Sequence, residues 1–102
     1  MSWYILNAKR EPVPATREEY YAWCDGERDF ETRMRVGYTD LGRDMYVSTV
    51  FLGLEHPGGM FFETMVKRGD IWVNESQARY RTWAEAEKGH SYTVAAMGGA
   101  RK

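Results

Sequence analysis

The sequence predicts an α+β domain in which an antiparallel meander of four to five strands is covered on one face by two helices. Three observations support this prediction. The middle of the chain is a succession of strand-forming runs separated by turn sequences. Two segments with helical periodicity each follow a helix-initiation motif. The length of 102 residues suits one domain, so we expect residues 1–102 to fold as a single unit.

The first quarter of the chain predicts a strand, a proline-containing segment and a short helix. Residues 3–6 are strand formers. Residues 8–15 contain two prolines, which lack the amide proton that a sheet interior needs, so this segment is a loop or an edge. Thr16 and Glu19 have the spacing of a capping box, in which each side chain accepts the other residue's amide proton. We therefore expect a helix over about residues 17–25.

Three strands in succession are predicted next. Residues 33–39 alternate between apolar and polar side chains, which is typical of a half-buried antiparallel strand. The expected apolar side consists of Met34, Val36 and Tyr38. After turn chemistry at 40–44, residues 45–54 are apolar on both faces and predict the central strand. A second turn at 56–59 leads to a returning strand over 60–66, which completes a meander.

The last third of the chain predicts an edge strand and a longer helix. Residues 71–73 either extend the sheet or begin a loop through 74–76, and residues 78–81 form a short edge strand. Thr82 and Glu85 repeat the capping-box spacing. In the helix that follows, side chains three or four residues apart predict a packing face. This face consists of Trp83, Ala86, His90, Val94 and Met97.

The central strand raises the question of what covers the second face of the sheet. Both of its faces are apolar, whereas two helices can cover only one of them. The other face is exposed, covered by the loop over 12–14, or buried against a partner chain. Because large exposed apolar patches usually mark interaction sites, we interpret this face as a binding surface.

Composition and charge narrow the classes of function. The net charge is −1, from 14 basic and 15 acidic residues, which argues against a general nucleic-acid-coating protein. Cys24 is the sole cysteine, so no disulfide forms within the chain, as suits a reducing compartment. No apolar run approaches the roughly 20 residues that span a bilayer, and residues 1–6 lack the features of a signal peptide. We expect a cytoplasmic protein without a membrane partner.

Few residues suggest chemistry. His56 and His90 are the only histidines, and with Glu55 or Glu63 they form a possible two-histidine, one-carboxylate metal site if they converge. The alternative is a hydrogen-bonded His90 packed on the helix stripe. For Glu63, which lies between apolar neighbours, the alternative is a cross-strand ion pair with Arg33 or Arg35. We predict no catalytic residue, no metal and no cofactor.

Three stretches carry a family resemblance: residues 47–56 (VSTVFLGLEH), 62–66 (FETMV) and 79–90 (RYRTWAEAEKGH). Their order and spacing resemble a widespread family of small uncharacterised proteins of bacteriophages and prophages. The chain departs from that pattern in a shorter turn at 56–60 and in the basic pair at 67–68. The resemblance implies a phage-type accessory protein in the host cytoplasm, and it provides no catalytic role to carry over to this chain. Proteins of that kind often block a host machine, as anti-CRISPR proteins do.

These observations favour a protein that acts by binding a host or phage protein, as a homodimer, and that inhibits a host defence system in the anti-CRISPR manner. The expected partner-binding residues are Tyr38, Tyr46, Phe51, Phe61, Glu63, Trp72 and Tyr80. One alternative is a small metal-dependent or acid/base enzyme that uses the two histidines and Glu63. The other is a nucleic-acid-binding module, with Arg33, Arg35, Arg43, Lys67 and Arg68 as its contacts.

Overall fold

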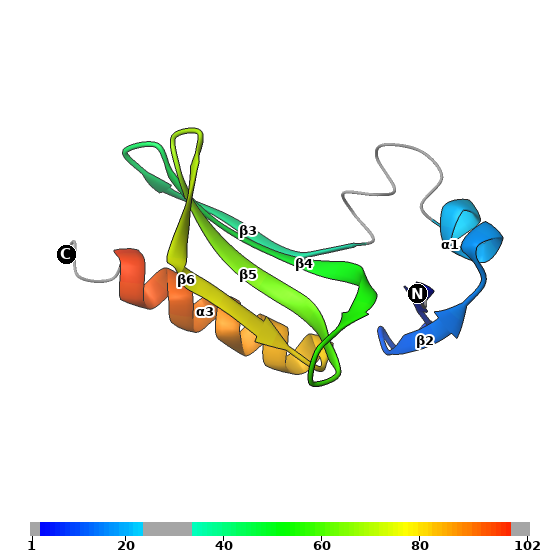
Figure 1. Ribbon diagram of the computed structural model, residues 1–102. Helices are drawn as coiled ribbons and strands as arrows, with labels where there is room; N and C mark the ends of the chain where they lie inside the picture. Colours follow the sequence, from blue (N-terminus) through cyan, green and yellow to red (C-terminus); the bar gives the residue numbers. More distant parts are fainter. Residues whose placement is uncertain (1–2, 24–33, 99–102) are drawn as a thin grey trace.

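The computed structural model describes residues 3–23 and 34–98 (Figure 1). In chain order its elements are β1 (Trp3–Leu6), β2 (Pro12–Ala15), α1 (Arg17–Trp23), β3 (Arg35–Gly42), β4 (Met45–His56), β5 (Met60–Arg68), β6 (Ile71–Tyr80) and α3 (Trp83–Gly98). The described strands form one six-stranded antiparallel sheet in the order β2-β1-β4-β5-β6, and β3 also pairs with β4. The predicted α+β class and meander are confirmed. The sheet has more strands than predicted because the proline segment pairs with β1 as an edge strand.

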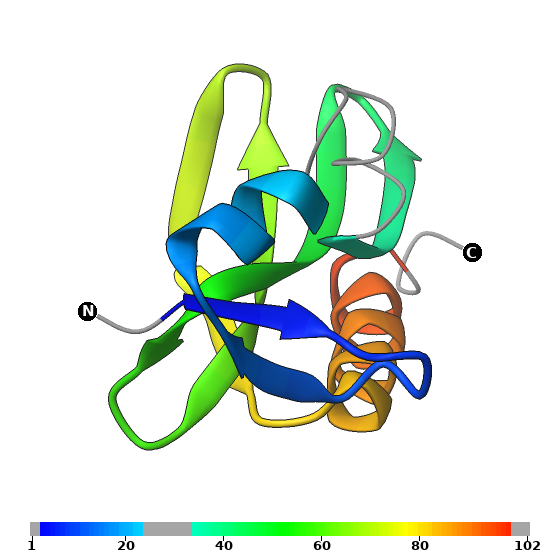
Figure 2. The same ribbon diagram turned by 90° about the vertical axis from the view of Figure 1, so that its right-hand side faces the viewer.

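β4 is the central strand, and its two halves have different neighbours. One edge pairs with β5, while the other pairs with β3 along residues 45–50 and with β1 at Leu54. The pairing is irregular after Phe51, where Gly53 has a φ of 77° and the ring of Tyr20 fills the space of a side chain. This bend carries the β1–β2 hairpin and α1 to one end of the molecule, away from the β3–β4 and β5–β6 turns (Figures 1 and 2).

The core lies between the sheet and the helices. Phe51 and Phe62 are fully buried, and each packs edge-on against a tryptophan from a different helix. Trp23 of α1 lies 5.7 Å from the Phe51 ring, and Trp83 of α3 lies 6.1 Å from the Phe62 ring. Both helices therefore contribute to the same core, as predicted. A second apolar cluster packs the far half of α3 against the sheet. It contains Leu41, Val47, Val66, Val94 and Met97.

The side chains of β3 do not face the core in the order that was predicted. Across β4, Arg35 pairs with Val50 whereas Gly37 pairs with Thr49, so one extra residue is accommodated between them. After this β-bulge the alternation changes face: Val36 packs against the core, but Tyr38 lies on the opposite side of the sheet. The prediction that these two side chains share a face was wrong because a regular alternation does not include the bulge.

β6 is one continuous strand rather than two short segments. Val73 pairs with Val66 of β5, and the next paired residue of β6, Ala78, pairs with Thr64. Between these two pairs β6 therefore contains more residues than β5. The surplus residues form an irregularity inside the strand, which accounts for the polar sequence at 74–76 that suggested a loop.

The predicted capping box at Thr16 is complete, whereas the one at Thr82 is present in a variant form in which the glutamate caps the amide of the residue that precedes Thr82. The Glu19 amide donates to Thr16 Oγ1 at 3.0 Å, and the Thr16 amide donates to the Glu19 carboxylate at 2.8 Å. At α3 the Glu85 amide donates to Thr82 Oγ1 at 3.1 Å, while the Glu85 carboxylate accepts the amide of Arg81. These bonds satisfy amides that have no partner inside the helix, and they explain why each helix begins where it does.

Candidate functional site

An aromatic stack lies on the face of the sheet that α3 leaves uncovered. The rings of Tyr38 and Tyr46 stack with their centroids 5.7 Å apart and an interplanar angle of 20°. The guanidinium of Arg35 lies 4.7 Å from the centroid of the Tyr38 ring. Tyr46 belongs to this face because it alternates with Val47, which packs towards α3. We call these three residues the aromatic stack.

The surroundings of the aromatic stack favour hydrogen bonding and ring contacts. Tyr38 is 49% exposed, so about half of its surface is accessible to another molecule. The carboxylates of Asp40 and then Asp44 raise the pKa of Tyr46 above its ordinary value, because they disfavour a phenolate beside them. The hydroxyl of Tyr46 therefore remains a hydrogen-bond donor at neutral pH. Arg35 adds further donors and a positive charge.

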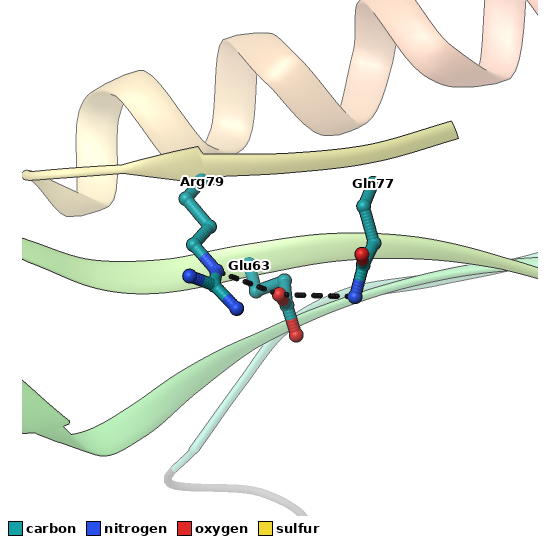
Figure 3. A network of polar contacts seen from close by, with 3 residues as sticks. All are labelled: Glu63, Gln77 and Arg79. Atoms are coloured by element: carbon teal, nitrogen blue, oxygen red, sulfur yellow. Dashed lines mark hydrogen bonds and ion pairs between the residues drawn. The ribbon is translucent and has the colours of Figure 1, made fainter. Parts of the chain in front are cut away.

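A polar cluster on the same face joins β5 to β6 (Figure 3). The Arg79 side chain donates from Nε to the Glu63 carboxylate at 2.9 Å, and Gln77 reaches the same oxygen at 3.4 Å. The three side chains point away from α3. Glu63 is only 8% exposed, so Arg79 and Gln77 supply hydrogen bonds to a carboxylate that has little contact with solvent.

The ion pair predicted for Glu63 exists, but with a different partner. Arg79 stands directly opposite Glu63 in the β5–β6 register. Arg35 pairs with Val50 on β4, which places it one strand further away, so it was the wrong choice. The other predicted partner, Arg33, lies outside the described residues.

His90 holds α3 on the sheet through a chain of hydroxyl groups. Its Nε2 lies 2.8 Å from Thr39 Oγ1, and its Nδ1 lies 2.7 Å from Thr49 Oγ1. Thr49 in turn lies 2.6 Å from Thr64 Oγ1 on β5. Burial lowers the pKa of His90, so the ring is neutral at pH 7, with one nitrogen donating and the other accepting. We call these four residues the His90 network.

The structure does not bring the two histidines and Glu63 together. His90 lies between α3 and the sheet, whereas the carboxylate of Glu63 lies on the opposite face. His56 ends β4 opposite Met60, beside the turn to β5. Within residues 3–23 and 34–98, no three His, Cys, Asp or Glu side chains are grouped closely enough to hold a metal ion. The convergence that the enzyme alternative requires is therefore not present.

The other predicted partner-binding residues separate into different environments. Phe51 is 1% exposed and belongs to the core, so this prediction was wrong: its position on β4 turns it towards α3. Phe61 is half-buried and packs edge-on against Tyr4, 4.6 Å away. Tyr80 packs towards α3 rather than on the open face. The side chain of Trp72 lies outside the description.

The basic residues of the nucleic-acid alternative that the structure describes lie on β3, in the β3–β4 turn and on β5, whereas Arg33 lies outside the described residues. Lys67 is opposite Tyr46, on the same face as Arg35, and Arg68 is opposite Met45. Arg43 occupies the β3–β4 turn with a φ of 55°. Asp40 and Asp44 lie in the same region, so the described part of this end of the sheet carries charges of both signs.

The predicted alternative of a packed, hydrogen-bonded His90 is confirmed, but sequence reasoning missed its threonine partners and a groove beside α3. The only sequence signal for the His90 network is that three strands each carry a threonine. The structure places these threonines on the side of the sheet that faces His90 of α3. An open groove between β6 and α3 had no local sequence signal.

No helix in the described ranges is both long enough and apolar enough to cross a bilayer. A scan against protein-family models found no matching family, and searches of curated proteins and of solved structures found no match to this chain.

Proposed function

We propose that this protein acts by binding another protein through the open face of its sheet and does not catalyse a reaction. The observation that carries the proposal is the aromatic stack of Arg35, Tyr38 and Tyr46 on the face that α3 leaves uncovered. Tyrosine and arginine are the residue types that most often anchor protein interfaces, because each combines a large contact area with hydrogen-bond donors.

The setting of the stack supports this role. It is carried by two paired strands of the meander, so its rings are held in place before a partner arrives, which lowers the entropy that binding costs. Half-buried Val50 and Met65 lie on the same face, between the stack and the Glu63–Arg79 pair. The face therefore offers an apolar centre with polar groups at its sides, as interfaces commonly do.

The identity of the partner is proposed from the family resemblance alone. A phage-type accessory protein meets host proteins in the host cytoplasm, and a host defence complex is a target of the kind that anti-CRISPR proteins block. Inhibition would follow from occupying a surface that the host complex needs. The proposal of a host defence complex as the partner is based on analogy with other phage proteins, and no residue of the open face contributes to it.

Affinity capture from a host lysate, followed by mass spectrometry, tests the proposal. The wild-type protein is compared with the double variant Tyr38→Ala/Tyr46→Ala, which removes both rings. Tyr21→Ala is the matched control, because Tyr21 is a 54% exposed tyrosine on α1, outside the open face. We expect one protein to be captured by the wild type and by the control but not by the double variant. A partner retained by the double variant would argue against the open face.

We also propose that the protein is a homodimer, since half-buried apolar side chains on the open face can pack against a second copy. Size-exclusion chromatography with light scattering should give twice the chain mass of 11.9 kDa. Loss of the dimer in Tyr38→Ala/Tyr46→Ala would assign the open face to the second copy, and the contact with another protein would then have to use a different surface. A monomer at all concentrations would remove the homodimer and leave the capture experiment to decide on the partner.

A further inference from the structure

A groove separates α3 from the final strand of the sheet. Its volume is about 530 Å³, within the range of sites that bind ligands. Three of its lining residues come from β6, including Ala78 and Tyr80, and the others come from α3. The groove is thus on the helix side of the sheet, separate from the aromatic stack.

The α3 wall of the groove is one stripe of the helix. Its residues recur every three or four positions, as neighbours on one helix face do. In order they are Glu85, Lys88, Gly89, Tyr92, Thr93, Ala96 and Met97. The stripe changes from charged at its beginning to apolar at its end. Tyr92 is 76% exposed and Ala96 is also exposed, so the apolar end of the wall is accessible.

The β6 side of the groove is the edge of the sheet. β6 is the last strand of the pairing order, and no other described strand pairs with its outer edge. An edge strand presents backbone N–H and C=O groups that remain available for pairing. Beyond the irregularity at 74–77, residues 78–80 pair regularly with β5. The free edge beside the groove is therefore in extended geometry.

We infer that the groove binds a short extended peptide segment of a partner protein, which adds as a further strand to the outer edge of β6. Only an extended chain uses both features at once. Its backbone pairs with β6, and alternate side chains enter the groove. A helix in the same place would leave the backbone groups of the edge without protein partners.

The lining specifies the chemistry of the peptide. Side chains that enter the groove meet Tyr80, Tyr92 and Met97, so apolar residues are expected at alternate positions of the segment. The intervening residues point towards the other face of the sheet. There they lie beside Gln77 and Arg79, so polar or acidic residues suit these positions.

Selection of a displayed heptapeptide library on the wild-type protein tests the inference. Ala96→Arg is the blocking variant, because an arginine at this exposed helix position fills the groove without removing a core contact. We expect enriched peptides with alternating apolar residues. Their affinity, measured by fluorescence anisotropy with the synthetic peptide, should fall at least tenfold on Ala96→Arg. N-methylation of alternate peptide amides should weaken binding by a similar factor, since it removes backbone donors.

Two controls separate this site from the open face. Tyr38→Ala/Tyr46→Ala should bind the peptide with unchanged affinity, and Tyr92→Arg serves as a second blocking variant if Ala96→Arg does not fold. The inference is overturned if no peptide is enriched, or if selected peptides bind Ala96→Arg as well as the wild type. It is also overturned if N-methylation has no effect, or if light scattering shows that a second copy of the chain occupies the groove.

Discussion

The ring of Tyr80 lies against the backbone of Gly89, in the space that a side chain at position 89 would occupy. A glycine inside a helix costs about 1 kcal/mol relative to alanine, so its presence in α3 needs a reason. The contact supplies one, because only a residue without a side chain lets the last residue of β6 approach the helix so closely. This contact also sets the shape of the groove beside α3.

Gly89→Ala is therefore expected to destabilise the protein despite the better helix propensity of alanine. The added methyl group must displace Tyr80, and overpacking of this kind costs about 1–3 kcal/mol. Chemical denaturation of the single variants and of Gly89→Ala/Tyr80→Ala measures the coupling between the two positions. In the absence of the Tyr80 ring, Gly89→Ala should become neutral or stabilising. A Gly89→Ala protein as stable as the wild type would contradict the contact.

Thr49→Val should cost more stability than Thr64→Val, although the two changes are chemically identical. The Thr49 hydroxyl contacts both His90 and Thr64, so its loss leaves a buried ring nitrogen and a buried hydroxyl without partners. Thr64→Val leaves the bond between Thr49 and His90 in place. We expect losses of about 1–3 and about 1 kcal/mol, respectively. Urea denaturation at pH 7.5 gives the comparison, and equal losses would mean that Thr49 does not bridge the network.

Stability is expected to fall in mild acid because of His90. Burial lowers its pKa in the folded protein, so below the unfolded value of about 6.5 the unfolded chain binds more protons than the folded chain. The contribution of His90 is therefore complete above that value and is lost as the pH falls below it. Urea midpoints between pH 7.5 and 5.0 should decline, and they should decline less steeply in His90→Gln.

An NMR titration of the histidine rings checks the same prediction directly. His90 should titrate below 6.5, with His56 in the same spectrum for comparison. A His90 ring that titrates at or above 6.5 would show that it is not held neutral between α3 and the sheet.

Arg79→Met should destabilise the protein more than Arg68→Met, which changes an exposed arginine on the adjacent strand. The first change leaves the nearly buried Glu63 carboxylate without its cation. Because the Arg79 side chain is 42% exposed, solvent screens part of the interaction, and we expect a loss of about 1–2 kcal/mol. Glu63→Gln/Arg79→Met should recover most of it. If the double variant is no more stable than Arg79→Met, the pair is not what stabilises this part of the sheet.

Several features of the fold followed from short-range patterns in the sequence. The capping boxes at Thr16 and Thr82 join residues within four positions of each other, so their geometry is independent of the rest of the chain. The turns and the apolar strip of α3 are similarly local. These signals were sufficient to predict the class, the central position of β4 and the order of the elements apart from β2 and the continuity of β6.

Tertiary structure decided which side chains meet. The bulge before Gly37 moves Tyr38 to the open face beside Tyr46, and the β5–β6 register gives Glu63 the partner Arg79. The aromatic stack, the ion pair and the groove all depend on pairing between strands. A shift of one residue reverses the face of every side chain that follows, and the packing of distant segments selects that shift. No pattern within a few residues contains this information.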